Sequence, residues 1–116
     1  MQRTDANDED RAQVPPGTLA MLILTILSHG PLHGYAIAQE ITRASREVLH
    51  VEEGSLYPAL QRMLLRGWVT AEWVKAGPRR EARVYRLTSA GRKQLATEVS
   101  DFTRAMKAIV RVIEPA

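Results

Sequence analysis

The chain of 116 residues contains no cysteine, which excludes disulfide bonds, cysteine-ligated metal sites and thiol nucleophiles. Long apolar runs are missing as well, because the most apolar stretch, Leu19 to Leu27, is far below the ~20 residues that a membrane-spanning helix needs. The first residues are polar and acidic, without the apolar stretch behind a basic start that marks a secretory signal. We therefore expect a soluble, cytoplasmic protein with no membrane partner.

Patterns typical of enzymes and of metal sites are also missing. The sequence has no glycine-rich loop suited to phosphate, no paired-carboxylate spacing, and no serine, histidine and aspartate arrangement that would activate a nucleophile. The three histidines, His29, His33 and His50, are not spaced four apart on one helix, so capping or exposed positions are favoured over metal ligation. The sequence predicts a protein that is not an enzyme and that needs no metal or cofactor.

Charge is distributed unevenly along the chain, whose net charge is +3. Residues 1–60 carry 4 basic and 8 acidic side chains, whereas residues 61–116 carry 12 basic and 5 acidic ones. Most of this excess lies between Arg62 and Lys93. A concentrated basic region is typical of proteins that bind a polyanion, although a solvated basic surface would give the same composition.

Apolar periodicity predicts four helices and one hairpin behind an N-terminal tail. Residues 1–16 are polar and acidic and are expected to form a disordered tail. In the third helix, Ser55 is the expected N-cap, and Pro58 is expected in the first turn, where proline is tolerated. The turn of the hairpin contains two adjacent arginines, so its tip is basic. Helices are expected at about residues 18–28, 33–44 and 55–67, strands at 68–75 and 82–87, and a final helix from a Thr88 cap to about Glu114.

The final helix carries a heptad pattern of apolar residues, typical of a helix that packs along a partner helix. A helix of this length extends roughly 35–40 Å, which is too long for one small core to cover. The first helix is apolar on nearly every side, so it is expected to share the same interface. We expect a homodimer, and a final helix folded back on its own domain is the alternative. The predicted interface residues are Leu19, Ile23, Leu95, Val99, Phe102, Met106, Ile109 and Ile113.

Three helices followed by a basic-tipped hairpin is the order of a winged helix-turn-helix domain. The predicted fold class is therefore mainly α with a small β-hairpin, with the tail at 1–16, the winged helix-turn-helix domain at 17–88 and a C-terminal dimerisation helix at 89–116. In this fold the third helix enters the major groove of DNA, and the wing contacts phosphates or the minor groove.

Several linked motifs between about Gly17 and Leu95 resemble the PadR family of bacterial regulators. The resemblance implies a dimeric repressor that binds an inverted repeat and is released by a small effector, phenolic or flat and aromatic in some members. The short final helix resembles the compact branch of the family. The motifs are Gly17-Thr18-Leu19, Ile23-Leu24 with Leu27, Pro31 to Ile37, Val51 to Leu60, Arg66 to Val69, and Arg83 to Thr88 with Gly91 and Leu95.

Two features depart from the family pattern. The acidic tail is not required by it, and the final helix contains no tryptophan, so stacking of a drug on an indole there cannot be assumed. An effector pocket between the first and final helices is one possibility, and plain core or interface packing is the alternative for the same positions. The candidate effector residues are Met21, Leu24, Phe102 and Met106.

The candidate DNA contacts lie at the start of the second helix, on the third helix and on the wing. Gln61 and Arg62 can make bidentate contacts to base edges, unless they form a solvated helix face. Tyr57 is either a DNA contact or a packed aromatic, and for Tyr35 phosphate contact and core packing are weighed equally. The predicted contacts are Tyr35, Ser55, Tyr57, Pro58, Gln61, Arg62, Lys75, Arg79, Arg80 and Arg83.

The two tryptophans and two glutamates near the predicted contacts are less specific candidates. Trp68 and Trp73 differ in strand parity and are expected on opposite sides of the hairpin, with Trp68 in the core and Trp73 as a wing support or a partly exposed ring. Glu52 and Glu53 are expected to favour the N-terminus of the third helix or to pair with arginines.

The leading prediction is an effector-responsive repressor that binds double-stranded DNA. A winged-helix module that binds an acidic protein partner is the alternative.

Overall fold

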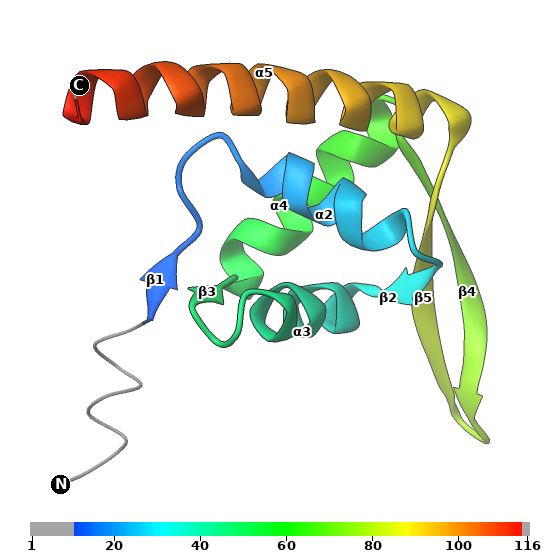
Figure 1. Ribbon diagram of the computed structural model, residues 1–116. Coiled ribbons are helices and arrows are strands. Elements are labelled where there is room, and N and C mark those ends of the chain that lie inside the picture. Colours follow the sequence, from blue (N-terminus) through cyan, green and yellow to red (C-terminus); the bar gives the residue numbers. More distant parts are fainter. Residues whose placement is uncertain (1–10, 115–116) are drawn as a thin grey trace, which may run out of the picture.

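The computed structural model describes residues 11–114, and it is mainly helical with a long hairpin (Figure 1). The fold class predicted from the sequence is therefore confirmed. The elements are β1 (Ala12–Gln13), α2 (Leu19–Leu27), β2 (Leu32–His33), α3 (Gly34–Ala44), β3 (Leu49–His50), α4 (Glu53–Leu65), β4 (Val69–Gly77), β5 (Arg80–Leu87) and α5 (Ser89–Ile113).

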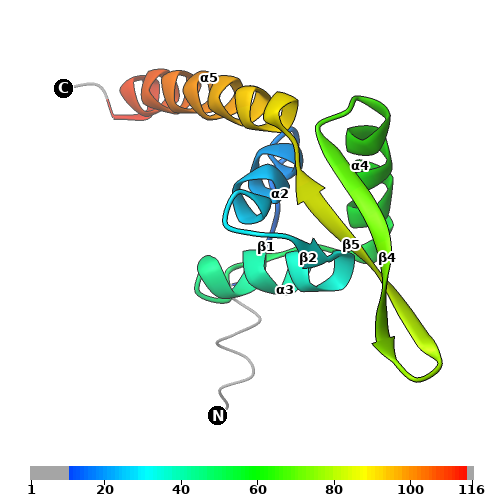
Figure 2. The ribbon, with the colours of Figure 1, turned by 90° about the vertical axis from the view of Figure 1, so that its right-hand side faces the viewer.

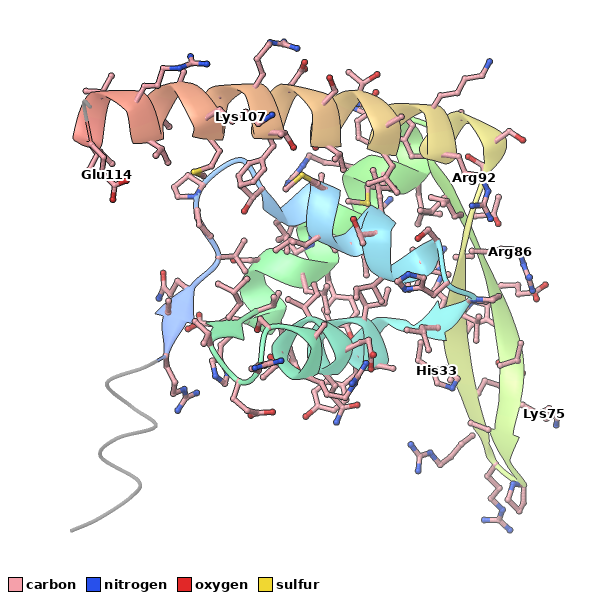
Figure 3. The ribbon with its side chains drawn as sticks, in the orientation of Figure 1. His33, Lys75, Arg86, Arg92, Lys107 and Glu114 are labelled. Carbon is pink, nitrogen blue, oxygen red and sulfur yellow. The ribbon has the colours of Figure 1, made fainter. Side chains whose placement is uncertain are left out.

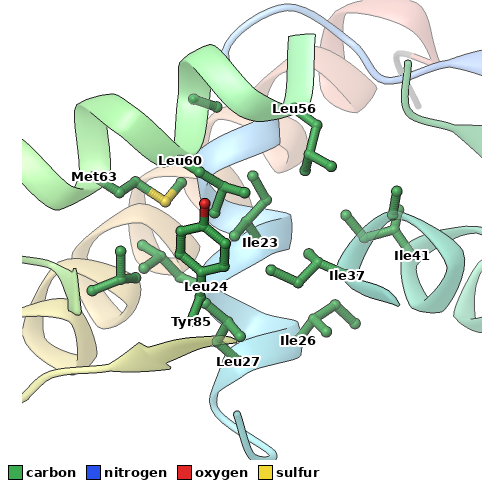
Figure 4. Packing of buried hydrophobic residues seen from close by; sticks show 13 residues of the cluster. Ile23, Leu24, Ile26, Leu27, Ile37, Ile41, Leu56, Leu60, Met63 and Tyr85 are labelled. Carbon is green, nitrogen blue, oxygen red and sulfur yellow. The ribbon is translucent and has the colours of Figure 1, made fainter. Parts of the chain in front are cut away.

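Helix α2 lies at the centre of the molecule, with α3 and α4 on one side and α5 on the other (Figure 1). This position explains why α2 is apolar nearly all round, since each side faces another element. Its Ile23 and Leu24 are wholly buried and pack with Ile37 of α3 and Leu60 of α4 (Figure 4). Burial of this kind supplies the main stabilisation of a small domain.

Two sequence predictions are corrected by this core. Ile23 was expected at a dimer interface, but its side chain has no exposed surface within one chain. Leu24 was expected to line an effector pocket, and it too is wholly buried. Leu19 is only partly buried and packs against the edge of the core. Most of the apolar residues of α2 are therefore buried within its own domain.

The N-cap of helix α4 lies three residues earlier than the predicted Ser55. Glu52 is the N-cap, without a side-chain hydrogen bond, and its carbonyl accepts from the amides of Ser55 at 3.0 Å and Leu56 at 2.9 Å. The first turn thus closes on Glu52, and Ser55 lies inside the helix instead of capping it. Pro58 falls beyond the first turn, and since it has no N–H it cannot donate to the carbonyl of Gly54.

The β4–β5 hairpin, called the wing below, projects beyond the helices (Figure 2). Its strands pair in register from Val69↔Leu87 to Lys75↔Glu81, and an irregularity follows between Lys75 and Gly77. The short strand β2 pairs with β5 and completes a three-stranded sheet in the order β2-β5-β4. The hairpin is longer at its tip than predicted, so its arginines are carried farther from the core.

A second, two-stranded sheet was not predicted from the sequence. Strand β1 pairs in parallel with β3, with Ala12 opposite Leu49, and the Ala12 amide donates to the Val48 carbonyl at 2.7 Å. Residues 11–16 are thereby placed beside the start of α4, whereas the sequence predicted them to belong to a disordered tail. The rest of that predicted tail, residues 1–10, lies outside the described residues.

Helix α5 is joined to the wing by a tightly packed connection. The Thr88 side chain caps the helix by accepting from the Gly91 amide at 3.0 Å, as predicted, and it donates to the Gly67 carbonyl at 2.6 Å. Gly91 is buried against the Trp68 carbonyl. From this connection α5 crosses α2, and its C-terminal half extends past the domain (Figures 1 and 2).

Candidate nucleic-acid interface

One side of α4 is buried and the other side is exposed. Leu56, Ala59, Leu60 and Met63 form the buried stripe, which holds the helix against the core. All ten residues predicted to contact DNA, on α4 and elsewhere, are exposed. The polar side of α4 is therefore accessible to a partner, and its orientation is fixed by the core.

The two faces of the wing differ in chemistry. Residues directly opposite each other in the register share a face, and Val69 and Tyr85 show that one face turns toward the core. Trp73 and Arg83 form a cross-strand pair on this same inner face. On the outer face Arg86 pairs with Glu72 at 3.7 Å and points away from the helices (Figure 3).

The inner face of the wing, the start of α3 and the side of α4 enclose a cleft of about 610 Å³, called the wing cleft below. It brings together four of the predicted contacts: Tyr35, Tyr57, Arg80 and Arg83. Trp73 and Tyr85 complete its aromatic lining, and Glu81 is an acidic member. Figure 3 shows His33, another lining residue, between α3 and the hairpin.

On the opposite flank of α4 lies a hollow of about 390 Å³, the arm hollow. Ser55, Pro58 and Arg62 line it from α4, and the segment from Gln13 to Gly17 forms the other wall. The predicted contacts are thus divided between two flanks of one helix. Lys75, Arg79 and Gln61 line neither cavity and lie on the open surface of the wing and of α4.

Tyr57 is held in the wing cleft by a close approach to α3. A Cβ at Gly34 would lie 2.9 Å from Cε1 of the Tyr57 ring, so only glycine allows the ring to approach the start of α3 this closely. Partial burial raises the pKa of the Tyr57 phenol, and the nearby Glu53 carboxylate and Tyr85 add to this effect. The phenol therefore stays protonated near neutral pH and can donate a hydrogen bond to an acceptor such as phosphate.

The sequence prediction did not include Trp73 among the binding residues. Its indole is 63% exposed, and the Arg83 guanidinium carbon lies 5.8 Å from its ring centroid. Trp73 lies four residues after the buried Val69 on the same strand. Because side chains alternate along a strand, this spacing could have placed Trp73 on the inner face. Trp68 precedes β4 and packs against the core, so the comparison of strand parity between the two tryptophans does not apply.

The candidate effector residues do not form one site. Met21 and Phe102 line a hollow of about 480 Å³ between α2 and α5, whereas Phe102 and Met106 line a separate one of about 430 Å³ along α5. Leu24 reaches neither of them. Within residues 11–114, no group of three histidine, aspartate or glutamate side chains is arranged to hold a metal ion.

The predicted dimer residues of α5 lie mostly on an exposed apolar face. Val99, Phe102, Met106, Ile109 and Ile113 are all exposed in the single chain. Leu95 instead packs against the edge of the core of its own domain. In the described part of the chain, no helix has both the length and the apolar character that crossing a membrane requires.

Comparison with solved structures identifies the fold. A transcriptional regulator from Clostridium thermocellum superposes with a TM-score of 0.79 at 23% identity, covering 84% of this chain and 95% of that one. A PadR family transcriptional regulator from Eggerthella lenta gives a TM-score of 0.76 at 23% identity, covering 97% and 92%. Bacillus subtilis PadR in complex with operator DNA gives 0.66 at 26% identity, covering 73% of this chain and 48% of that protein.

The comparison with family models agrees with the fold and with the motifs. The model of the transcriptional regulator PadR-like family matches residues 23–97, a segment that runs from α2 through α4 and the wing into α5. This match covers well over half of the chain, and the chain therefore belongs to the PadR-like family of transcriptional regulators.

Proposed function

We propose that this protein is a sequence-specific DNA-binding repressor that binds an inverted-repeat operator as a homodimer and responds to a small effector. The observation that carries the proposal is the surface on which the exposed side of α4 adjoins the arginines of the wing. The likeness to a PadR protein bound to operator DNA supports a role in DNA binding.

The residues of this surface divide into two kinds of contact. Gln61 and Arg62 on α4 carry side chains that match adenine and guanine edges in the major groove. Arg79 at the hairpin turn and Arg80 at the start of β5 suit phosphate or a minor groove, where charge matters more than base identity. We expect α4 to supply sequence preference and the wing to supply affinity.

The homodimer is proposed from the exposed apolar face of α5. A face of this kind along a helix is stabilised when it packs against another helix. A second copy of α5 would provide a matching face by two-fold symmetry, and two-fold symmetry in turn suits an inverted repeat. The hollows beside Phe102 lie next to this face, so an effector bound there could shift the dimer between two arrangements.

The first experiment is fluorescence anisotropy with the DNA immediately upstream of the protein's own gene and with a scrambled duplex. Both are measured at two salt concentrations. We expect a preference for the native duplex and a ~10³–10⁵-fold loss of affinity between about 50 and 200 mM salt if six to ten phosphates are contacted. The same assay then supports a screen for effectors.

The alternative function is a winged-helix module that binds an acidic protein, with the basic wing as its contact surface. Absence of binding to either duplex at low salt would contradict the proposed repressor and favour this alternative. Equal affinity for both duplexes would contradict sequence specificity while retaining DNA binding.

A further inference from the structure

We propose that the wing cleft receives one sugar–phosphate strand of the DNA, and that Trp73 positions Arg83 toward that strand. This inference rests on the proposed function and adds to it a site and a residue. Trp73 acts as a positioning residue, and Arg83 makes the contact to phosphate.

The argument begins with the arrangement of Arg83. Its guanidinium carbon lies 5.8 Å from the ring centroids of both Trp73 and Tyr85. Tyr85 is buried in the core and fixes one side, whereas Trp73 stands on the exposed side. An arginine near two aromatic rings loses rotamer freedom before it binds, so less entropy is lost when phosphate arrives.

The charges around the wing favour Arg83 over Arg86 as the contact to phosphate. Within residues 11–114, the ion pairs do not include Arg83, whereas Arg86 on the outer face pairs with Glu72. Glu81 lies in the wing cleft, but it is directly opposite Lys75 across the strands, where opposite charges offset each other. The cleft therefore keeps a positive charge for an anionic partner.

The facing wall supplies hydrogen-bond donors. The Tyr57 phenol is protonated, and Tyr35 is exposed beside it. The first residues of α3 also line the cleft, and the N-cap, His33, makes no side-chain bond to the amides of the first turn. Phenols, a guanidinium and helix N-terminal amides are the donors that bind phosphates and sugars in DNA complexes.

A strand of duplex DNA fits this geometry better than an isolated anion does. The cleft opens beside the exposed side of α4 and reaches Arg80 near the tip of the wing. A backbone strand that flanks the groove occupied by α4 would pass between these two elements. The exposed indole of Trp73 then lies against deoxyribose, which offers apolar surface without base identity.

The test uses the two tryptophans of the chain as separate probes. Trp68→Phe leaves Trp73 as the only tryptophan, and Trp73→Phe leaves Trp68. Each variant is titrated with a fluorescein-labelled duplex of the upstream DNA, while duplex anisotropy, tryptophan emission and acrylamide quenching are measured. We expect bound DNA to shield Trp73 from acrylamide and to leave the quenching of Trp68 unchanged.

The outcomes separate this inference from the proposed function. If anisotropy reports binding and Trp73 remains as accessible to acrylamide as before, the wing cleft does not bind a DNA strand. The proposed repressor function is then unaffected. If anisotropy reports no binding for the unmodified protein, the proposed function itself fails. Shielding of both tryptophans would indicate a general change in the domain and would contradict the site.

The positioning role is tested by a double-mutant cycle. Trp73→Ala and Arg83→Ala should each weaken binding by about tenfold and each lower the salt slope by about one, and Trp73→Phe should retain most of the affinity. Because Trp73 acts through Arg83, the double variant should bind no more weakly than Arg83→Ala alone. Additive losses would overturn the role, and Arg86→Ala on the outer face is the matched control.

Discussion

At Gly91 the absence of a side chain allows α5 to lie directly against the wing and the segment that joins α4 to β4. A Cβ at this position would lie 2.1 Å from the Trp68 carbonyl oxygen and 2.6 Å from Cδ1 of Leu87. The carbonyl belongs to the backbone and cannot rotate away as a flexible side chain would. The requirement for glycine is therefore one of space, since Gly91 is not among the glycines with positive φ.

Gly91→Ala should lower the free energy of unfolding by at least about 2 kcal/mol, because overpacking against backbone forces α5 to shift. Urea denaturation followed by circular dichroism measures this loss. Gly54→Ala is the matched control, since nothing lies within 4 Å of its Cβ position, and it should leave stability equal or slightly higher. Equal losses in the two variants would contradict the packing argument.

Gln61 and the wing arginines should differ in what their removal changes. Gln61→Ala should weaken binding to the operator by about five- to 150-fold and leave binding to random DNA unchanged, because a base contact carries the preference. Arg79→Ala with Arg80→Ala should weaken binding to both duplexes and lower the salt slope by about two. Anisotropy at several salt concentrations measures both, and equal losses on both duplexes for Gln61→Ala would remove it from the base contacts.

At the scale of elements, the sequence predicted those whose periodicity is set by the core. Helices α2, α3 and α5 lie within a residue or two of expectation, because their apolar residues repeat at helical spacing and Thr88 is a true cap. The start of α4 was misplaced because Glu52 caps it without a side-chain bond. Strands β1 and β3 have two residues each, which is too short for any period to appear.

The candidate site, like the fold, could be predicted from the sequence only in part. Exposed polar residues on α4 and at the hairpin turn follow from helix and strand patterns. The wing cleft does not, because it forms only when the inner face of the wing meets the start of α3. The division of the α4 residues between two flanks likewise depends on where residues 13–17 lie.

The exposed face of α5 makes a direct prediction for assembly. Ile109→Lys should convert the proposed dimer into a monomer, because a charge in an apolar helix interface is left unpaired. Sedimentation velocity measures the change in mass. Ser100→Lys adds the same charge elsewhere on this helix, at a position outside the apolar heptad, and should leave the dimer intact. A dimer that survives Ile109→Lys would show that another surface joins the subunits.

At the scale of the whole molecule, charge is divided between the two ends of the chain. Residues 1–10 contain one arginine and four acidic residues, a net charge of −3, so residues 11–116 alone carry +6. Strand β1 holds the chain beside the arm hollow, where Arg62 lies. The point where residues 1–10 join the described part of the chain therefore lies next to the surface proposed to bind DNA.

Removal of residues 1–10 should tighten binding to any duplex by about two- to tenfold at low salt, and the gain should shrink as salt screens the charges. Anisotropy at two salt concentrations measures it. A full-length variant with Asp5, Asp8 and Asp10 changed to Asn and Glu9 to Gln is the matched control for charge. It should reproduce the gain, and a gain from the truncation alone would show that charge is not the cause.

The connection at Thr88 and Gly91 leaves little slack between α5 and the domain that carries α4. In a dimer formed through α5, the distance between the two copies of α4 is then fixed by the fold and not by a flexible linker. A duplex turns by roughly 35° for each base pair, since one turn takes 10–10.5 of them. One inserted base pair between the half-sites would carry the second half-site out of phase with its helix. The protein would thus discriminate operators by helical phase as well as by the bases that it contacts.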